Sequence, residues 1–90
     1  MPRYLIERRF VDGLRLPTDD SGVQFCHVIV ENNVPDGVTW LTSYVSADRK
    51  RVFCVYEAPT PEAIRRVASR NRLPVHEITE VRVLDPYFYR

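Results

Sequence analysis

The hydrophobic and polar positions of this chain fall into short alternating stretches separated by two stretches of helical spacing. Residues 3–10 mix aromatic and aliphatic side chains with charged ones in rough alternation, as a half-buried strand does. Residues 38–47 and 51–57 are rich in valine and aromatic residues and predict two strands joined as a hairpin by the three residues between them. Residues 77–84 predict the last strand, which an aromatic tail follows.

The first predicted helix covers residues 23–34. Asp19, Asp20 and Ser21 precede it and can each cap free backbone N–H groups, and a Pro-Asp-Gly turn ends it. The β-branched run at 28–30 would also suit a strand, but the capping residues favour a helix. Its apolar positions at helical spacing are Val23, Cys26, Val30 and Val34, with Phe25 and Ile29 as a further pair.

The second predicted helix begins at Thr60-Pro61-Glu62. This segment combines a capping hydroxyl, a proline where no N–H donor is needed, and an acid in the first turn. Leu73-Pro74 ends the helix. Its apolar side consists of Ala63, Ile64, Val67 and Ala68.

The order strand–helix–strand–strand–helix–strand predicts a single α+β domain over residues 1–90. It is the order of a ferredoxin-like sandwich, in which a four-stranded antiparallel sheet carries both helices on one face. The first strand is then central in the sheet. The other face of the sheet stays uncovered, and we expect function to lie there.

The side chains of each strand alternate between the two faces. The more uniformly aliphatic side of the hairpin, with Leu41, Val45, Phe53 and Val55, suits the helices, as do Tyr4 and Ile6 of the first strand. The positions assigned to the open face are Leu5, Glu7, Trp40, Thr42, Tyr44, Val52, Cys54, Tyr56, Glu80 and Arg82.

An open face with several aromatic side chains would be an apolar patch larger than monomers usually expose. We therefore expect a homodimer in which two copies pack face to face. The aromatic tail Tyr87-Phe88-Tyr89 is expected to clasp the second subunit.

Composition narrows the classes of partner. Thirteen basic and twelve acidic residues give a formal net charge of +1, which argues against a nucleic-acid or membrane partner. No stretch approaches the ~20 apolar residues of a membrane span. The two cysteines lie in different predicted elements and form no disulfide framework, which indicates a reduced, cytoplasmic setting.

Three segments resemble one known family. GVTWLTSYVS (37–46), VFCVYEAPTPEAIRR (52–66) and LPVHEITEVRVLDPYFYR (73–90), with the opening MPRYLIER, are similar to the small actinobacterial nickel-responsive, nickel-binding proteins, otherwise catalogued as a domain of unknown function. The resemblance covers most of the chain and is weakest over residues 12–36. It implies a ferredoxin-like dimer that binds nickel and has no assigned enzymatic activity.

One position departs from this family's pattern. Its members usually carry a histidine in a Trp-x-His-Ser-Tyr segment of the second strand, where this chain has Thr42. Imidazole is a good nickel ligand and a hydroxyl is a poor one. The departure therefore implies a weakened nickel site.

Cys54, with Tyr44 and Glu7 near it, is the best candidate metal site, since thiolate and carboxylate are both metal ligands. The alternative is that Cys54 is a small core residue and Glu7 pairs with Arg82. His27 is a further candidate ligand because Glu31 lies one helical turn away, although two ligands hold a metal poorly. We interpret His76 as solvent-exposed.

No complete catalytic motif is present, and neither histidine is placed by the sequence to activate Cys54 as a nucleophile. The leading hypothesis is a non-enzymatic, dimeric nickel-binding protein. The alternative is a dimeric, monooxygenase-like barrel that binds a small organic ligand on its aromatic sheet face. A purely structural oligomerisation module is the third possibility.

Overall fold

A computed structural model of the chain describes residues 1–16 and 19–87. The strands are β1 (Arg3–Arg9), β2 (Thr39–Val45), β3 (Arg51–Glu57) and β4 (Glu77–Val81), the helices are α1 (Asp20–Asn33) and α2 (Pro61–Asn71), and the 3₁₀ turn η1 (Val34–Asp36) follows α1. Their order along the chain is the predicted one.

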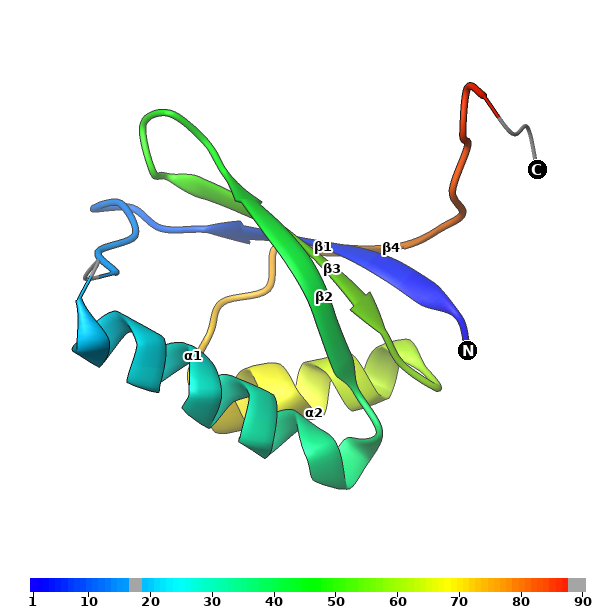
Figure 1. Ribbon diagram of the computed structural model, residues 1–90, viewed down its shortest axis with the longest axis horizontal. Helices are drawn as coiled ribbons and strands as arrows, with labels where there is room; N and C mark the ends of the chain where they lie inside the picture. Colours follow the sequence, from blue (N-terminus) through cyan, green and yellow to red (C-terminus); the bar gives the residue numbers. More distant parts are fainter. Residues whose placement is uncertain (17–18, 88–90) are drawn as a thin grey trace.

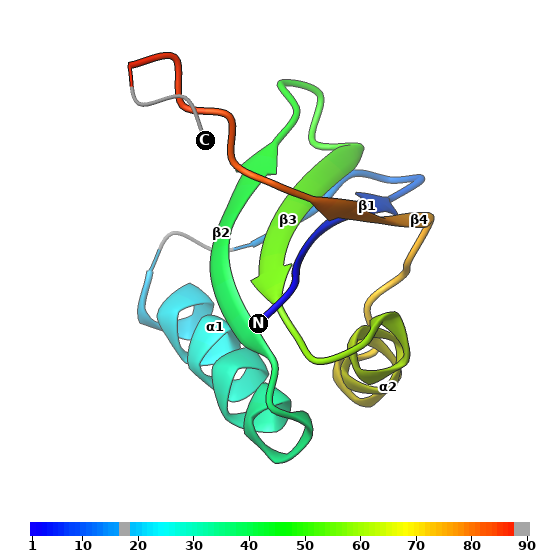
Figure 2. The same ribbon diagram turned by 90° about the vertical axis from the view of Figure 1, so that its right-hand side faces the viewer.

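The strands form a single antiparallel sheet in the order β2-β3-β1-β4, so β1 and β3 are central. Both helices lie on one face of this sheet, and no helix covers the other (Figure 1). Seen from the side, α1 runs beneath β2, and α2 lies toward the other edge (Figure 2). The predicted α+β, ferredoxin-like fold class is confirmed.

Both helices begin at the capping residues that the sequence indicates. The Asp19 carboxylate accepts a hydrogen bond from the backbone N–H of Ser21 at 3.0 Å, and the Thr60 hydroxyl accepts one from the N–H of Ala63 at 3.1 Å. Arg72 ends α2 in the left-handed conformation, with φ of 56°.

The covered face of α1 differs from the one predicted. Gly22, Ile29 and Asn33 are the buried residues of this helix, whereas Val23 and Val30 are about half exposed. A glycine and an asparagine carry no hydrophobic signal, so the apolar pattern indicated a face rotated by about one residue.

One carboxylate fastens the end of α1 to α2. Asp36 of η1 accepts hydrogen bonds from Nε of Arg66 at 2.9 Å and from Nη2 of Arg70 at 2.8 Å. Arg70 also donates to the backbone carbonyl of Asn32. These two arginines hold the pKa of Asp36 below its ordinary value.

The core lies between α2 and the covered face of the sheet. Tyr4 and Ile6 of β1 pack there, as predicted. The other buried members of this cluster are Val38, Val52, Cys54, Tyr56, Ala58, Ala63, Ile64 and Val67.

A bulge in β2 places Trp40 on the opposite face from Thr42 and Tyr44, with which it was predicted to share the open face. The pairing of β2 with β3 is irregular between Trp40, which opposes Tyr56, and Thr42, which opposes Val55. Such a bulge inserts one residue, so positions on its two sides no longer share the same parity. Trp40 therefore lies on the helix-covered side, while Thr42 and Tyr44 lie on the open side.

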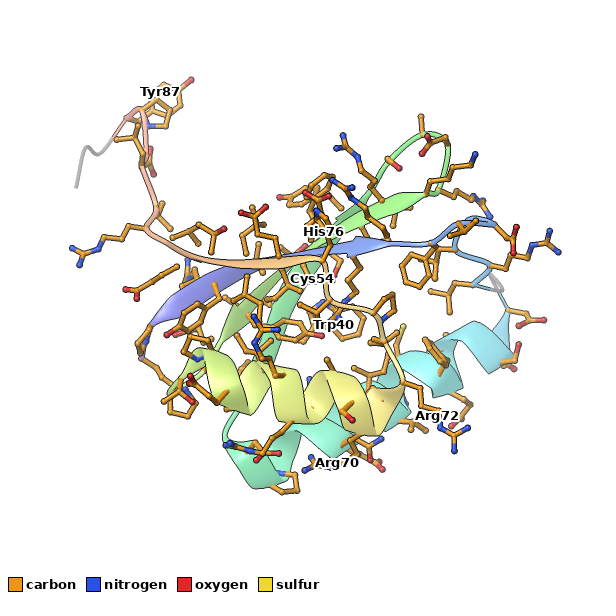
Figure 3. The ribbon with its side chains drawn as sticks, turned by 180° about the vertical axis from the view of Figure 1, so that it is seen from behind. Trp40, Cys54, Arg70, Arg72, His76 and Tyr87 are labelled. Atoms are coloured by element: carbon orange, nitrogen blue, oxygen red, sulfur yellow. The ribbon has the colours of Figure 1, made fainter. Side chains whose placement is uncertain are left out.

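β4 ends at Val81, three residues before the predicted end, and the chain then leaves the globule (Figures 1 and 2). Tyr87 lies far from the sheet and is 87% exposed (Figure 3). The other tail residues named in the clasp prediction, Phe88 and Tyr89, lie outside the described residues. Among those described, no helix is long and apolar enough to cross a membrane.

Candidate functional site

The open face of the sheet carries two rows of side chains that run across all four strands. The first row, in pairing order, is Tyr44, Phe53, Glu7 and Glu77. The second row is Thr42, Val55, Leu5 and Thr79. Apolar side chains thus occupy the inner strands at Phe53, Val55 and Leu5, with the acidic Glu7 among them, and polar or phenolic side chains lie at both ends of each row.

This face was expected to be aromatic, and Tyr44 and Phe53 bear that out in part. Tyr44 is 65% exposed, whereas Phe53 and Val55 are half-buried without any helix above them. The Arg51 guanidinium lies over the Phe53 ring at 5.3 Å from its centroid. The positively charged Arg51 therefore borders the apolar area around Phe53.

Glu7 is the acidic residue at the centre of the open face. Its Oε2 accepts a hydrogen bond from Nε of Arg9 at 2.8 Å. This bond is the largest cause of the lowered pKa of Glu7. Burial opposes it, and the charges of Arg9, His76 and Arg51 each lower the pKa by a smaller amount. Glu7 is therefore a carboxylate at neutral pH and can serve as a cation ligand.

Two further residues of types that can bind metal ions, Glu77 and His76, lie at the start of β4, which pairs with the strand of Glu7. Glu77 opposes Glu7 in the strand pairing, and the backbone N–H of His76 donates to the Glu7 carbonyl at 2.8 Å. His76 is exposed to solvent, as predicted. The signal that was missed is the antiparallel register of β1 and β4, which sets the start of β4 against Glu7.

Cys54 and Tyr56 do not lie on the open face. Cys54 is 4% exposed and Tyr56 is 1% exposed, and both pack toward the helices (Figure 3). Because Cys54 pairs with Ile6 in the register, its side chain points to the opposite face from Glu7. The predicted cluster of Cys54, Glu7 and Tyr44 is therefore wrong for a single chain, and Cys54 is a core residue.

The length of the hairpin turn explains this error. A connection formed by residues 48–50 would set Tyr44 opposite Cys54, whereas in the structure residues 47–50 form it, because the N–H of Ser46 donates to the Arg51 carbonyl at 2.9 Å, and Tyr44 lies opposite Phe53. Thr42, Tyr44 and Val45 keep their predicted faces, since Val45 opposes the buried Val52, whereas Trp40 and the residues of β3 change face. The corrected placements are Trp40, Val52, Cys54 and Tyr56 on the covered side, and Phe53 and Val55 on the open side.

The remaining candidates are separate from one another. His27 and Glu31 are exposed on α1, on the other side of the molecule from the open face. Arg82 follows the end of β4, where Val81 pairs with Arg3, so it lies at the opposite end of β1 from Glu7. Glu7 pairs with Arg9 in place of Arg82. Among the described residues, no three histidine, cysteine or acidic side chains are grouped so as to hold a metal ion.

The covered side of the sheet contains a second polar feature, the fully buried Arg8. Its Nη1 donates to the Pro74 carbonyl at 2.9 Å, and its Nη2 donates to the Tyr56 hydroxyl at 3.2 Å. The guanidinium also lies 5.7 Å from the centroid of the Tyr56 ring. Burial raises the pKa of Tyr56 despite the neighbouring charge, so the phenol is neutral.

The fold and the open face define the chain as a small α+β protein of the ferredoxin-like type. Residues 4–81 match the family described as nickel responsive protein SCO4226-like, and the chain belongs to that family. Its fold is similar to the crystal structure of SCO4226 from Streptomyces coelicolor A3(2) with a TM-score of 0.72 and 22% sequence identity, over 90% of this chain and 96% of that one. No curated protein matches the sequence.

Proposed function

We propose that the protein is a non-enzymatic nickel-binding protein that acts as a homodimer. The observation that carries the nickel assignment is membership of a nickel-responsive family over residues 4–81. The absence of a grouped ligand set among the described residues of one chain agrees with a site completed by two copies. The unpaired cysteines support a cytoplasmic setting.

The proposed occupant of the open face is a second copy of this chain. The face carries both signs of charge at its edges, with Arg9 beside Glu7 and Arg3 within 3.8 Å of Glu57. A two-fold axis presents the same surface from both sides, so such a face can be complementary to itself. Apolar burial at Val55 and its neighbours supplies the driving force, which a chain this small needs.

The proposed nickel ligands are on that same face. Glu7 supplies a carboxylate that is ionised at neutral pH, and Glu77 and His76 lie next to it. Carboxylate and imidazole are both common ligands of divalent transition metals. Tyr44, in the same row, is exposed and can line the site from β2. A second copy of the chain packed over this row would add its own set of the same ligand groups.

Dimer formation is tested by light scattering on a matched pair of variants. The chain has a mass of 10.6 kDa, so the wild type is expected at about twice that value. Val55→Glu introduces a charge at the centre of the open face and should give the monomer mass. Val28→Glu makes the same change at an exposed position of α1 and should leave the dimer intact. A wild-type monomer, or an equal effect of both substitutions, would contradict the proposal.

Nickel binding is tested by isothermal titration calorimetry of the wild-type dimer with nickel chloride. Saturable heat with a fixed metal-to-chain ratio is expected. A titration without heat, repeated by equilibrium dialysis without bound nickel, would refute the nickel assignment while leaving the dimer result unaffected.

A further inference from the structure

A partly open, apolar cavity of about 100 Å³ lies between α1 and the covered face of the sheet. Phe25 and Ile29 line it from α1, and Trp40 and Cys54 line it from the sheet. Trp40 and Cys54 lie on the helix side of the sheet (Figure 3). This cavity is on the opposite side of the sheet from the proposed nickel face, so it is a separate site.

The charged residue in the cavity lining is Arg8, which is only 2% exposed. Its Nη atoms donate hydrogen bonds to Pro74 and Tyr56, but its Nε, which the protein covers, has no hydrogen-bond partner within residues 1–16 and 19–87. Arginine keeps its charge in proteins, and an isolated buried charge is strongly unfavourable. Within the described part of the chain, no acidic side chain forms an ion pair with it.

Tyr56 does not supply the missing negative charge. Burial raises the pKa of its phenol above the ordinary value of 10.0, so it remains neutral at physiological pH. The cavity therefore combines an apolar lining, an uncompensated guanidinium and an unused N–H donor. This combination suits a small amphipathic anion, whose charged group would meet the guanidinium and whose apolar part would meet the lining.

We propose that this cavity binds a small organic carboxylate. On binding, the Arg8 side chain shifts so that its covered Nε donates a charge-assisted hydrogen bond to the carboxylate, and the apolar body lies against Phe25, Ile29 and Trp40. An apolar cavity of about 150 Å³ is known to admit benzene. The cavity here is smaller but partly open, so it admits a short-chain acid, or part of a single-ring acid with the rest at the opening. A small inorganic anion would leave the apolar lining unused.

The fluorescence of Trp40 provides a direct readout, because it is the only tryptophan and it lines the cavity. Sodium benzoate and sodium butyrate are titrated into the wild-type protein beside benzyl alcohol and sodium sulfate. Saturable fluorescence changes are expected with the two carboxylates, at least about tenfold tighter than with the alcohol, since a hydrogen bond to a charged group is worth about that factor or more. Sulfate should not compete.

Two variants and a control test separately the charge of the Arg8 guanidinium and the space inside the cavity. Arg8→Met should weaken benzoate binding at least about tenfold and leave benzyl alcohol unchanged. Arg3→Met makes the same substitution on the open face of the same strand and should bind benzoate as the wild type does. Cys26→Phe fills the cavity from α1 without removing Arg8 and should abolish both signals.

Cys26→Phe keeps the test decisive if Arg8→Met fails to fold. Equal affinity for benzoate and benzyl alcohol, competition by sulfate as strong as that by butyrate, or no saturable change with either carboxylate at millimolar concentration would each overturn the proposal. Retained benzoate binding in a folded Cys26→Phe variant would place the ligand elsewhere and overturn it equally.

Discussion

The guanidinium of Arg8 donates to the Tyr56 hydroxyl across the two central strands at 3.2 Å, and both side chains are buried. Tyr56 therefore satisfies part of a charge that has no acidic partner among the described residues. The pair links the core of the fold to the cavity beneath α1.

This pairing predicts strong coupling between the two side chains. Tyr56→Phe should lower the free energy of unfolding by about 1–3 kcal/mol, because it leaves a buried donor of Arg8 without its partner. In an Arg8→Met background the same substitution should cost close to nothing. Urea unfolding of the four proteins of this double-mutant cycle measures the coupling. Equal costs in both backgrounds would show that the hydrogen bond contributes nothing.

The raised pKa of Tyr56 predicts a loss of stability in alkali. The unfolded chain ionises near the ordinary value of 10.0, whereas the folded chain ionises at higher pH. The unfolded state thus releases its proton first, and the stability present below pH 10.0 falls as the pH rises past that value. Urea midpoints at about pH 8 and above pH 10.0 measure the effect. Tyr56→Phe should show a smaller drop than the wild type, and an equal drop would contradict the assignment.

Asp36 predicts the opposite dependence in acid. Its pKa in the folded chain lies below the ordinary value of 3.8, chiefly because Arg66 and Arg70 donate to it. The stability that it contributes is present above pH 3.8 and is lost as the pH falls through the folded value. Asp36→Asn should lower the thermal midpoint at neutral pH and reduce its fall in acid. Asp12→Asn, at an exposed turn, serves as the control. An unchanged acid profile in Asp36→Asn would contradict this account.

Thr42 predicts that nickel affinity can be raised on the open face. Thr42→His should tighten nickel binding at least about tenfold, because imidazole replaces a poor ligand beside the row that contains Glu7. Ser69→His is the control, since it introduces the same group at an exposed position of α2, away from the open face. Calorimetric titration measures both. A similar gain from the two variants would show that any added histidine suffices and that position 42 has no special role.

The sequence predicted the elements, their order and the uncovered sheet face, because capping residues and strand alternation are local signals. It failed at the hairpin. The Asp48-Arg49-Lys50 segment does not specify a turn length as Asn-Gly would, and the connection is one residue longer than predicted, which shifts β3 by one residue against β2. The predicted cysteine–glutamate cluster was lost for that reason, and the bulge between Trp40 and Thr42 changes the face of Trp40 as well.

Arg8 was missed for a different reason. The alternation that places Tyr4 and Ile6 on the covered face also places Arg8 there. Arginine is so rarely buried, however, that alternation alone does not predict a buried arginine. Glu77 and His76 were missed because their position near Glu7 follows from the register of β4, which the sequence does not state.

The central claim is that nickel binds on the open face and not at the cysteine in the core. Calorimetric titration of nickel into the wild type, Glu7→Gln and Cys54→Ser, at equal chain concentration, tests it most directly. The account predicts saturable binding by the wild type, loss of at least about tenfold in affinity for Glu7→Gln, and an unchanged affinity for Cys54→Ser. Binding that survives in Glu7→Gln but disappears in Cys54→Ser would contradict it.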